Sequence, residues 1–308
     1  MDGVLNIYKP QGMTSHDVVS KIRRIYGQKR VGHAGTLDPM ATGVLPVLVG
    51  TAAAAQDYLM EHEKQYRAGM RFGILTDTGD ITGTILKTTE CNFSEGEIRN
   101  AAARYVGTIE QIPPMYSAIK IGGKKLYELA REGISVERKA REITISSIAF
   151  KQKTTDTDYV FDVFCSKGTY IRTLCEDIGT SLGCGATLFS LERRSVGRFH
   201  VENSVTIETL EQIKNSEHPE NLEQYLLSTE TIFEKHPAVT LSEFYARLSK
   251  NGAEIYLEKA KIDENLFQDG TWCRLYDHNG KFYALGELCS FENGKAIKAR
   301  VRFDTERK

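Results

Sequence analysis

The irregular order of strand-like and helical segments is the strongest constraint on this fold. Apolar residues alternate over Val4–Tyr8, and the run Val44–Val49 has the continuous apolar character of a buried strand. Between them, the stretch from Thr14 to Asp17 reads as a capping box ahead of an apolar stripe with helical spacing that stops at Gly27. The segments do not repeat as regular βα units, so the sequence predicts a mixed α+β fold.

Further segments continue this pattern and divide the chain in two. Strand-like composition is found at residues 65–72, 84–86, 117–121, 141–150 and 158–165. Helical patterns are found at 51–60, after a capping box formed by Ser94 and Glu97, and at 169–178. The acidic segment 203–237 predicts a surface helix and linker. Short strand-like runs follow at 272–276, 282–288 and 297–303. We therefore expect a larger domain over 1–236 and a small β-rich domain over 237–308.

Charge is nearly balanced over the chain but unevenly distributed. The 308 residues contain 41 Asp or Glu and 40 Lys or Arg. Residues 1–50 hold six Lys or Arg against three Asp, whereas residues 201–240 hold eight Glu against two Lys. One face is therefore expected to meet a polyanion that another face repels.

The sequence contains no pattern typical of a secreted, membrane or metal-binding protein. Its six cysteines have no CxxC spacing, the chain opens without a signal-peptide pattern, and no apolar stretch approaches about 20 residues. No GxxxxGK[ST], dinucleotide fingerprint or HExxH motif occurs. We therefore expect a cytoplasmic protein with reduced cysteines that uses no metal, no cofactor and no membrane.

Asp38 is the only acidic residue in the stretch GHAGTLDPMATGVLPVLVG, residues 32–50. An Asp before a Pro commonly begins a turn, and this structural role is the simplest interpretation of Asp38. The surrounding glycines, however, allow another molecule to approach closely, and the apolar run that follows anchors the loop on a buried strand. A rigid carboxylate that is partly desolvated and open on one side suits nucleophilic catalysis.

Arg172 is a candidate partner for this carboxylate. In CSKGTYIRTL it falls in the first turn of a predicted helix, where the helix dipole disfavours a cation by roughly 0.3–1 kcal/mol. Either a carboxylate or phosphate offsets this cost, or the side chain extends into solvent. If the partner is Asp38, the guanidinium would hold the carboxylate ionised and oriented. Tyr66 and Tyr170, each near a cation, are either half-buried structural residues or platforms for an unpaired base.

Two basic clusters are candidates for contacts with phosphate groups. The first, between residues 120 and 141, includes Lys124 and Lys125 mixed with glutamates, and a solvated helix with internal ion pairs is the alternative interpretation. The second includes Arg193 and Arg194, which on a strand would project to opposite faces. His33 alone gives only a weak signal.

Several long motifs resemble those of the TruB-type tRNA pseudouridine synthases, in the same order and over almost the whole chain. They are GVLNIYKPQGMTSHDVV, GHAGTLDPMATGVLPV, KQYR, TDTGDITG, CSKGTYIRTLCEDIG, and LGCGA followed by LERRSVGRF. The resemblance implies a central mixed, mainly antiparallel sheet crossed by the active cleft. It also implies a mobile thumb insertion at about 120–141 and a C-terminal domain similar to the PUA RNA-binding module.

The resemblance carries roles to individual positions. It assigns the catalytic aspartate to Asp38, the active-site tyrosine to Tyr66 and the arginine that pairs with the aspartate to Arg172. A substrate-contacting histidine falls on His33, and the nucleotide pocket is expected to be lined by Tyr170 and Leu191. The chain departs from the family pattern at Ala52–Ala55, Thr187 and Glu192, and these departures concern RNA affinity or local packing.

The implied activity is the conversion of uridine to pseudouridine at position 55, in the T loop of tRNA. Asp38 is the expected nucleophile on a flipped-out uridine, and attack on the ribose, attack on the base and a glycal route all remain open. The expected partner is the T stem-loop of tRNA, bound by a monomer. A non-catalytic RNA-binding or tRNA-folding protein on the same scaffold is the alternative function. A glycoside hydrolase is a weaker alternative, because no paired general acid can be nominated near Asp38.

Overall fold

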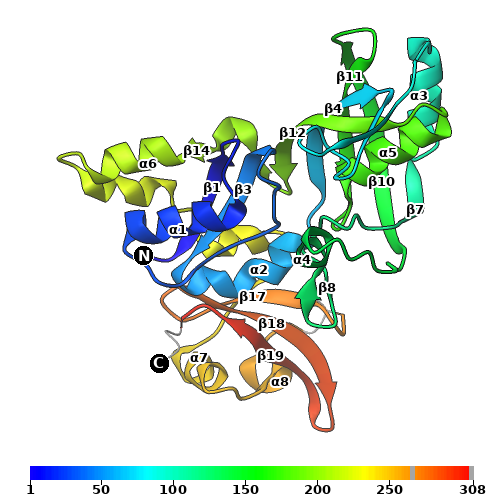
Figure 1. Cartoon of the computed structure of the whole chain (residues 1–308). Helices are drawn as coiled ribbons and strands as arrows, with labels where there is room; N and C mark the ends of the chain where they lie inside the picture. Colours follow the sequence, from blue (N-terminus) through cyan, green and yellow to red (C-terminus); the bar gives the residue numbers. More distant parts are fainter. Residues whose placement is uncertain (264–267, 305–308) are drawn as a thin grey trace.

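The computed structural model describes residues 1–263 and 268–304, which form a large mixed sheet and a smaller second sheet (Figure 1). Within the described residues the large sheet has the order β14-β1-β3-β12-β4-β11-β10-β7, with β2 beside β3 and β13 beside β12. Its strands are β1 (Gly3–Lys9), β2 (Val31–His33), β3 (Thr42–Val49), β4 (Lys64–Phe72), β7 (Gly107–Gln111), β10 (Arg141–Lys153), β11 (Asp158–Cys165), β12 (Ala186–Val196), β13 (Phe199–His200) and β14 (Val205–Thr206).

Helices and short hairpins surround this sheet. The α-helices of this part are α1 (Ser15–Tyr26), α2 (Gln56–Met60), α3 (Glu95–Ala103), α4 (Leu126–Arg131), α5 (Ile171–Ser181) and α6 (Ile207–Lys214). The 3₁₀ helices are η1 (Gly50–Ala55), η2 (Val201–Asn203), η3 (Pro219–Tyr225) and η4 (Thr229–Phe233). Two hairpins pair β5 (Ile74–Thr76) with β6 (Ile85–Thr88), and β8 (Lys120–Ile121) with β9 (Lys124–Lys125).

β12 is the strand that joins the two halves of the large sheet. It pairs antiparallel with β4 from Ala186 to Val196, whereas its parallel pairing with β3 covers only Glu192 opposite Thr42 and Arg193 opposite Gly43. At this short junction Gly43 has φ +101, and a Cβ there would lie 2.3 Å from the carbonyl oxygen of Arg193. Glycine is therefore required for the two strands to meet.

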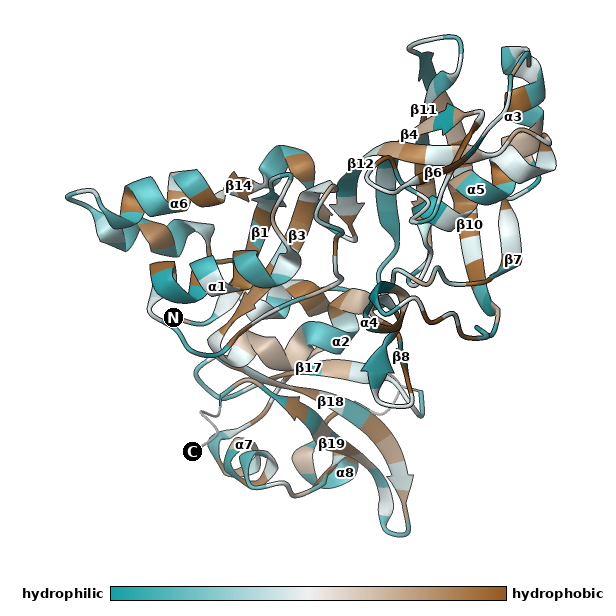
Figure 2. Ribbon diagram, in the orientation of Figure 1, coloured by the Kyte–Doolittle hydropathy of each residue, from teal (hydrophilic) through white to brown (hydrophobic). Residues whose placement is uncertain are grey.

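Each half of the sheet has its own apolar core. The stripe predicted on α1 packs against β1 and β3 through Val18 and Ile22, which are fully buried. On the other half, Leu174 and Ile178 of α5 pack in a second cluster with Met70 of β4. Figure 2 shows apolar segments, in brown, along β1 and β3 of this sheet. The cavity described below lies where the two halves meet.

The C-terminal sheet has the order β15-β17-β18-β19-β16 within the described residues. Its elements are β15 (Ala238–Thr240), α7 (Glu243–Lys250), β16 (Ile255–Tyr256), α8 (Leu257–Ala260), β17 (Trp272–Tyr276), β18 (Phe282–Phe291) and β19 (Gly294–Arg302). An apolar cluster that includes Phe233, Leu285 and Phe303 packs it against η1. Ala52 and Ala55 of η1 are fully buried in this cluster, so the alanine run serves packing between the two parts of the chain.

The structure confirms the mixed α+β class and the central, mainly antiparallel sheet. Both predicted capping boxes, at Thr14 and Ser94, are present, and Gly27 ends α1 with φ +60. The expected strand over 117–121 is wrong except for Lys120–Ile121, because 112–119 is a loop, of which 117–119 line the cavity. The predicted helix over 51–60 is a 3₁₀ segment followed by the short α2. Within 203–237 the linker also supplies β14, which pairs with β1.

Candidate active site

A cavity of about 340 Å³ lies at the carboxyl end of the Gly35–Asp38 loop. Six of the predicted site residues line it: Asp38, Tyr66, Tyr170, Arg172, Leu191 and Arg193. The other four, His33, Lys124, Lys125 and Arg194, lie outside its lining. Segments 117–119 and 167–169 complete the wall. Residues far apart in the sequence therefore surround one pocket of nucleoside size.

The loop that carries Asp38 is fixed by hydrogen bonds on both sides of the carboxylate. The main chain forms a turn in which Ala41 N donates to Asp38 O at 3.0 Å. Before it, Leu37 N donates to Ser15 Oγ at 2.9 Å. After it, Pro39 O accepts from Gly12 N at 2.8 Å and from Lys9 Nζ at 3.4 Å. Asp38 is thus both the turn residue of the simplest interpretation and a carboxylate held in place at the cavity.

Arg172 lies against Asp38 and is almost fully buried. Its Nε is 3.0 Å from Asp38 Oδ2, and the side chains of Arg172 and Asp38 are 6% and 38% exposed. The remaining donors reach main-chain carbonyls, with Nη1 to Thr78 O at 2.9 Å and Nη2 to Tyr116 O at 2.7 Å. A second carboxylate, Asp80, lies 3.7 Å from Nη1. The guanidinium therefore connects the Asp38 carboxylate to the loops that contain Thr78 and Tyr116.

Burial dominates the electrostatics of the Asp38 carboxyl. It raises the pKa of Asp38 above its usual value, and the neighbouring Asp80 adds to the rise, whereas Arg172 and Lys9 work against it. The carboxylate is consequently more basic than one in water, and a partly desolvated, oriented carboxylate of this kind is a better nucleophile than a solvated one.

The two tyrosines of the cavity differ in how they are held. Tyr66, on β4, is only 7% exposed, and burial raises its pKa while the nearby Arg193 guanidinium works against the rise. Tyr170 lies directly before α5, and its peptide is held on both sides by Gln111: Tyr170 N donates to Oε1 at 2.8 Å, and Nε2 donates to Tyr170 O at 3.1 Å. Because Gln111 is 2% exposed, this clamp fixes the start of the helix that carries Arg172.

The two arginines of the second basic cluster differ in their surroundings. Arg193 is 1% exposed, and its Nε and Nη2 donate to Val44 O at 2.7 Å and Gly35 O at 2.9 Å. It therefore lies beneath the cavity, where it cannot reach a phosphate on the surface. Arg194 on the opposite face pairs with Glu192 at 3.0 Å and with Glu202, so its charge is already matched. Two of the three departures from the family pattern have local partners. Glu192 pairs with Arg194, and the hydroxyl of Thr187 hydrogen-bonds to that of Thr76 at 3.0 Å.

The basic segment near 120–141 combines a hairpin with a short helix. Lys124 and Lys125 form β9, and Lys124 pairs with Glu132 at 3.3 Å with its side chain 59% exposed. Lys125 Nζ donates to Tyr127 Oη at 3.1 Å. Both lysines lie at the surface, where an exposed ion pair contributes little and exchange for a phosphate is easy.

His33 is on β2, opposite Val47 of β3, and outside the cavity lining. Burial lowers the pKa of His33, and Arg193 and His16 add to this effect. Its Nδ1 is buried without a hydrogen-bond partner in the described part of the chain.

Sequence reasoning missed several residues that build the site. Lys9 is fully buried, and besides Pro39 it donates to Met13 O at 2.6 Å and Pro10 O at 2.9 Å. Asp80 of TDTGDITG orders its own turn by accepting from Thr82 N at 3.0 Å while facing Arg172. The signal for Lys9 was a lysine ending an apolar strand before a proline. The signal for Asp80 was an acid in a threonine-rich turn.

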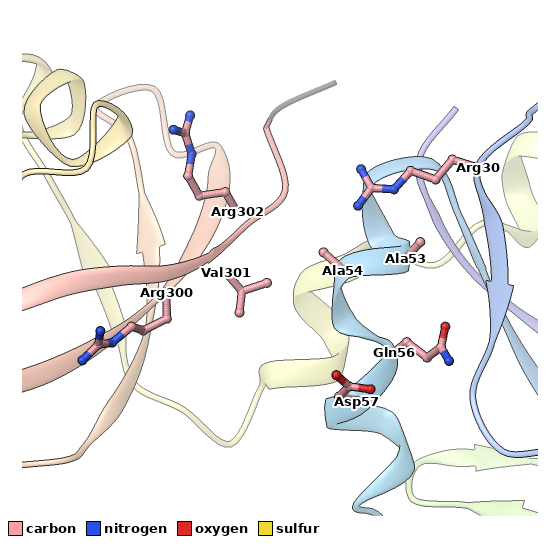
Figure 3. Close-up of a pocket in the computed structure, with 8 residues that line it drawn as sticks. All are labelled: Arg30, Ala53, Ala54, Gln56, Asp57, Arg300, Val301 and Arg302. Atoms are coloured by element: carbon pink, nitrogen blue, oxygen red, sulfur yellow. The ribbon is translucent and has the colours of Figure 1, made fainter. Parts of the chain in front are cut away.

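A larger cleft, of about 680 Å³, lies between η1, α2 and β19 (Figure 3). Figure 3 shows Arg30, Gln56 and Asp57 on one side and Arg300 and Arg302 on the other. Arg300 pairs with Glu287 at 2.8 Å and Arg302 with Asp304 at 3.1 Å. The cleft shares no lining residue with the Asp38 cavity, and two of its three arginines are paired, so the smaller cavity is the candidate active site.

The described residues contain neither a metal-binding cluster nor a membrane-spanning helix. No group of three His, Cys, Asp or Glu side chains is placed to hold a metal ion. None of the helices in residues 1–263 and 268–304 has the length and apolar character needed to span a membrane.

Solved structures share this architecture over nearly the whole chain. A chain in the crystal structure of a Cbf5-Nop10-Gar1 complex matches with a TM-score of 0.72 and 25% identity, covering 98% of this chain and 84% of that one. A chain in the structure of an H/ACA RNP bound to a substrate RNA containing 2′-deoxyuridine matches with a TM-score of 0.73 at 23% identity, covering 99% and 86%. The large sheet with its Asp38 cavity and the PUA-like C-terminal sheet therefore have the pseudouridine synthase fold.

Comparisons with family models and with individual relatives identify the family of this chain. Residues 23–171 match the TruB family pseudouridylate synthase (N terminal domain), and residues 172–234 match the tRNA pseudouridylate synthase B C-terminal domain. The tRNA pseudouridine synthase B of Clostridium tetani is 44% identical over 98% of this chain and 100% of its own length. That of Alkaliphilus oremlandii is 47% identical over 83% of each chain. The chain belongs to the TruB family of pseudouridine synthases.

Proposed function

We propose that this enzyme converts the uridine at position 55 in the T loop of tRNA to pseudouridine, with Asp38 as the nucleophile. Its coarser activity follows from family membership: the chain is a tRNA pseudouridine synthase, which isomerises uridine in tRNA. The ion pair between Asp38 and Arg172, 3.0 Å long at the wall of a cavity of nucleoside size, is the observation that carries the finer proposal.

The reaction needs a nucleophile and a cavity that confines the detached uracil, and the chain supplies both. The bond between N1 of uracil and C1′ of ribose breaks, the detached uracil turns, and C5 forms a new bond to C1′ while its proton is released. In the ribose route, a carboxylate oxygen of Asp38 bonds to C1′ as N1 leaves, and C5 then displaces it. The step needs no oxidant, because the product is an isomer of the substrate.

The cavity residues fit this sequence of events. Arg172 orients the carboxylate, while Tyr66 and Leu191 offer an aromatic and an apolar surface to the base. Unstacking the target nucleotide costs a few kcal/mol, which stacking on Tyr66 would offset. In a glycal route Tyr66 would instead act as the base. The carboxylate is needed in each route.

We further propose a division of labour along the chain. Residues 1–236 carry out catalysis, with the thumb at about 120–141 contacting the T stem-loop, and residues 237–308 bind RNA as a PUA-like domain. The enzyme acts as a monomer in the cytoplasm.

Tritium release from tRNA labelled at C5 of uracil tests the proposal. The parent chain should release tritium from tRNA that contains the T-loop uridine and none from tRNA in which that uridine is replaced. The Asp38→Asn chain should bind the same tRNA with similar affinity and release nothing. Undiminished release would reject Asp38 as the nucleophile, and release from the substituted tRNA would reject position 55. Binding without release by the parent chain would favour the non-catalytic alternative.

A further inference from the structure

Lys64 places a buried ammonium group at the wall of the cavity. It is the first residue of β4 and only 7% exposed. Its Nζ donates to the carbonyl of Met60, the last residue of α2, at 2.9 Å and to that of His62, in the turn that follows, at 2.6 Å. An ammonium group has three N–H donors. The third has no acceptor among the described residues.

Arg193 adds a second buried cation beside it. Two of its nitrogens donate to main-chain carbonyls, of Val44 and Gly35, and no carboxylate in the described chain pairs with it. Its charge repels that of Lys64. Main-chain carbonyls satisfy the hydrogen bonds of these cations but do not neutralise them, and a buried charge without a counter-ion is costly.

The other charges that line the cavity all have partners. Arg172 is matched by Asp38 at 3.0 Å and Asp80 at 3.7 Å, and Lys167 pairs with Glu61. The positive excess is therefore confined to Lys64 and Arg193, which we call the Lys64–Arg193 face.

Gly35 keeps this face open. Its φ is +85, and a Cβ there would lie 3.2 Å from Arg193 Nη1 and 3.9 Å from Lys64 Cε. Any side chain at this position would stand between the two cations and the cavity. The glycine thus leaves a small positively charged recess at the foot of the loop that carries Asp38.

We propose that the Lys64–Arg193 face binds a phosphate group of the nucleotide whose base enters the cavity. Lys64 donates its free N–H to a phosphate oxygen, and Arg193 supplies charge from beneath without touching the ligand. A neutral uracil carbonyl would leave the excess charge unmatched, whereas a phosphodiester neutralises it. This subsite rests on the proposed function, because it names the part of the tRNA that the same cavity holds.

The titration of Lys64 supports this arrangement. Burial and Arg193 lower the pKa of Lys64 to about 8, whereas Cys165 and Glu61 work against the shift and Lys167 adds to it. A bound anion favours the charged form of the ammonium. Binding of tRNA above pH 8 should therefore be accompanied by proton uptake, and Lys64→Met should remove that uptake.

A cycle of protein and RNA changes tests the subsite. Binding is measured with the Asp38→Asn chain, with and without Lys64→Met, so that turnover does not interfere. The ligands are tRNA and two tRNAs that carry one neutral methylphosphonate, at the 5′ or the 3′ phosphate of the target nucleotide. We expect one methylphosphonate to weaken binding by the Asp38→Asn chain roughly ten-fold or more, as for loss of a charge-assisted hydrogen bond. The same RNA should cause no further loss when Lys64 is methionine.

Controls separate this subsite from a structural role and from the proposed function. Lys64→Arg should retain most of the affinity. Lys151→Met, which breaks a surface pair with Asp162 at 3.2 Å, should leave the methylphosphonate effect unchanged. Equal methylphosphonate effects with and without Lys64 would overturn the proposal. A loss on Lys64→Met that neither methylphosphonate reproduces would assign Lys64 to the base. Tritium release by the parent chain is read separately, so failure of the subsite leaves the isomerisation intact.

Discussion

Replacing Arg172 with methionine tests whether one guanidinium holds the cavity together. The change leaves the carbonyls of Thr78 and Tyr116 without their donor, and each unsatisfied buried group costs about 1–3 kcal/mol. It also leaves Asp38 and the buried Asp80 without a counter-ion. We expect the free energy of unfolding to fall by about 3–5 kcal/mol, the range for removing one partner of a buried pair.

Urea unfolding and tritium release measure the two consequences. Since native domains have about 5–15 kcal/mol of stability, the Arg172→Met chain should still fold in water. Its kcat/KM should fall roughly 10²-fold or more, as expected for a misplaced reacting group. Because Arg172 lowers the pKa of Asp38, the acid limb of the pH profile should move to higher pH in the variant. Arg172→Lys keeps the positive charge and should shift that limb less.

Arg71→Met is the matched control. Arg71 makes two hydrogen bonds to Asp158, at 2.8 and 2.7 Å, further along β4 and outside the cavity lining. Its loss should lower stability and leave kcat/KM and the pH profile unchanged. The reasoning is refuted if Arg172→Met unfolds like the parent chain, or if its residual activity keeps the parent's acid limb.

Three further predictions follow from contacts described above. Changing Lys124 and Lys125 to alanine should weaken tRNA binding and reduce the slope of log affinity against log salt by roughly 0.7–0.9 per lost phosphate contact; an unchanged slope would remove them from the interface. Gln111→Leu should lower the free energy of unfolding by about 1–3 kcal/mol, because the peptide N–H of Tyr170 loses its acceptor; an unchanged free energy of unfolding in urea would contradict the clamp. The pKa of Lys64 is below that of an unfolded lysine, so the unfolded chain binds more protons between pH 8 and 10.5. Stability should therefore rise with pH in that window, by on the order of 3 kcal/mol, relative to Lys64→Met, and a flat difference in urea unfolding would exclude this titration.

Local signals in the sequence predicted local structure. The capping boxes at Thr14 and Ser94 require only residues within one turn, and both helices begin there. The apolar run before Gly50 likewise indicated a buried strand from neighbouring residues alone, and it forms β3. By contrast, the linker strand β14 forms by pairing with the edge of β1. The loop 112–119 is held at the site because Arg172 donates a hydrogen bond to the carbonyl of Tyr116. Such long-range contacts leave no periodic pattern.

The same distinction applies to the candidate site. The position of Arg172 at a helix start, unfavourable for a cation, indicated an acid partner, and Asp38 lies 3.0 Å away. The Arg193-Arg194 pair showed only that two cations alternate on a strand. Which of them is covered depends on the neighbouring strand β3, so the sequence did not show that Arg193 is the buried member. Lys9 and Lys64 were missed because a lone lysine normally indicates surface.

The position of β12 in the large sheet sets an order on events during synthesis. Asp38 and Tyr66 leave the ribosome early, but they belong to sheet halves that only β12 joins, and β12 begins at residue 186. A nascent chain therefore carries both reacting groups long before it can bring them into one pocket. The catalytic pocket can therefore form only after β12 has been synthesised.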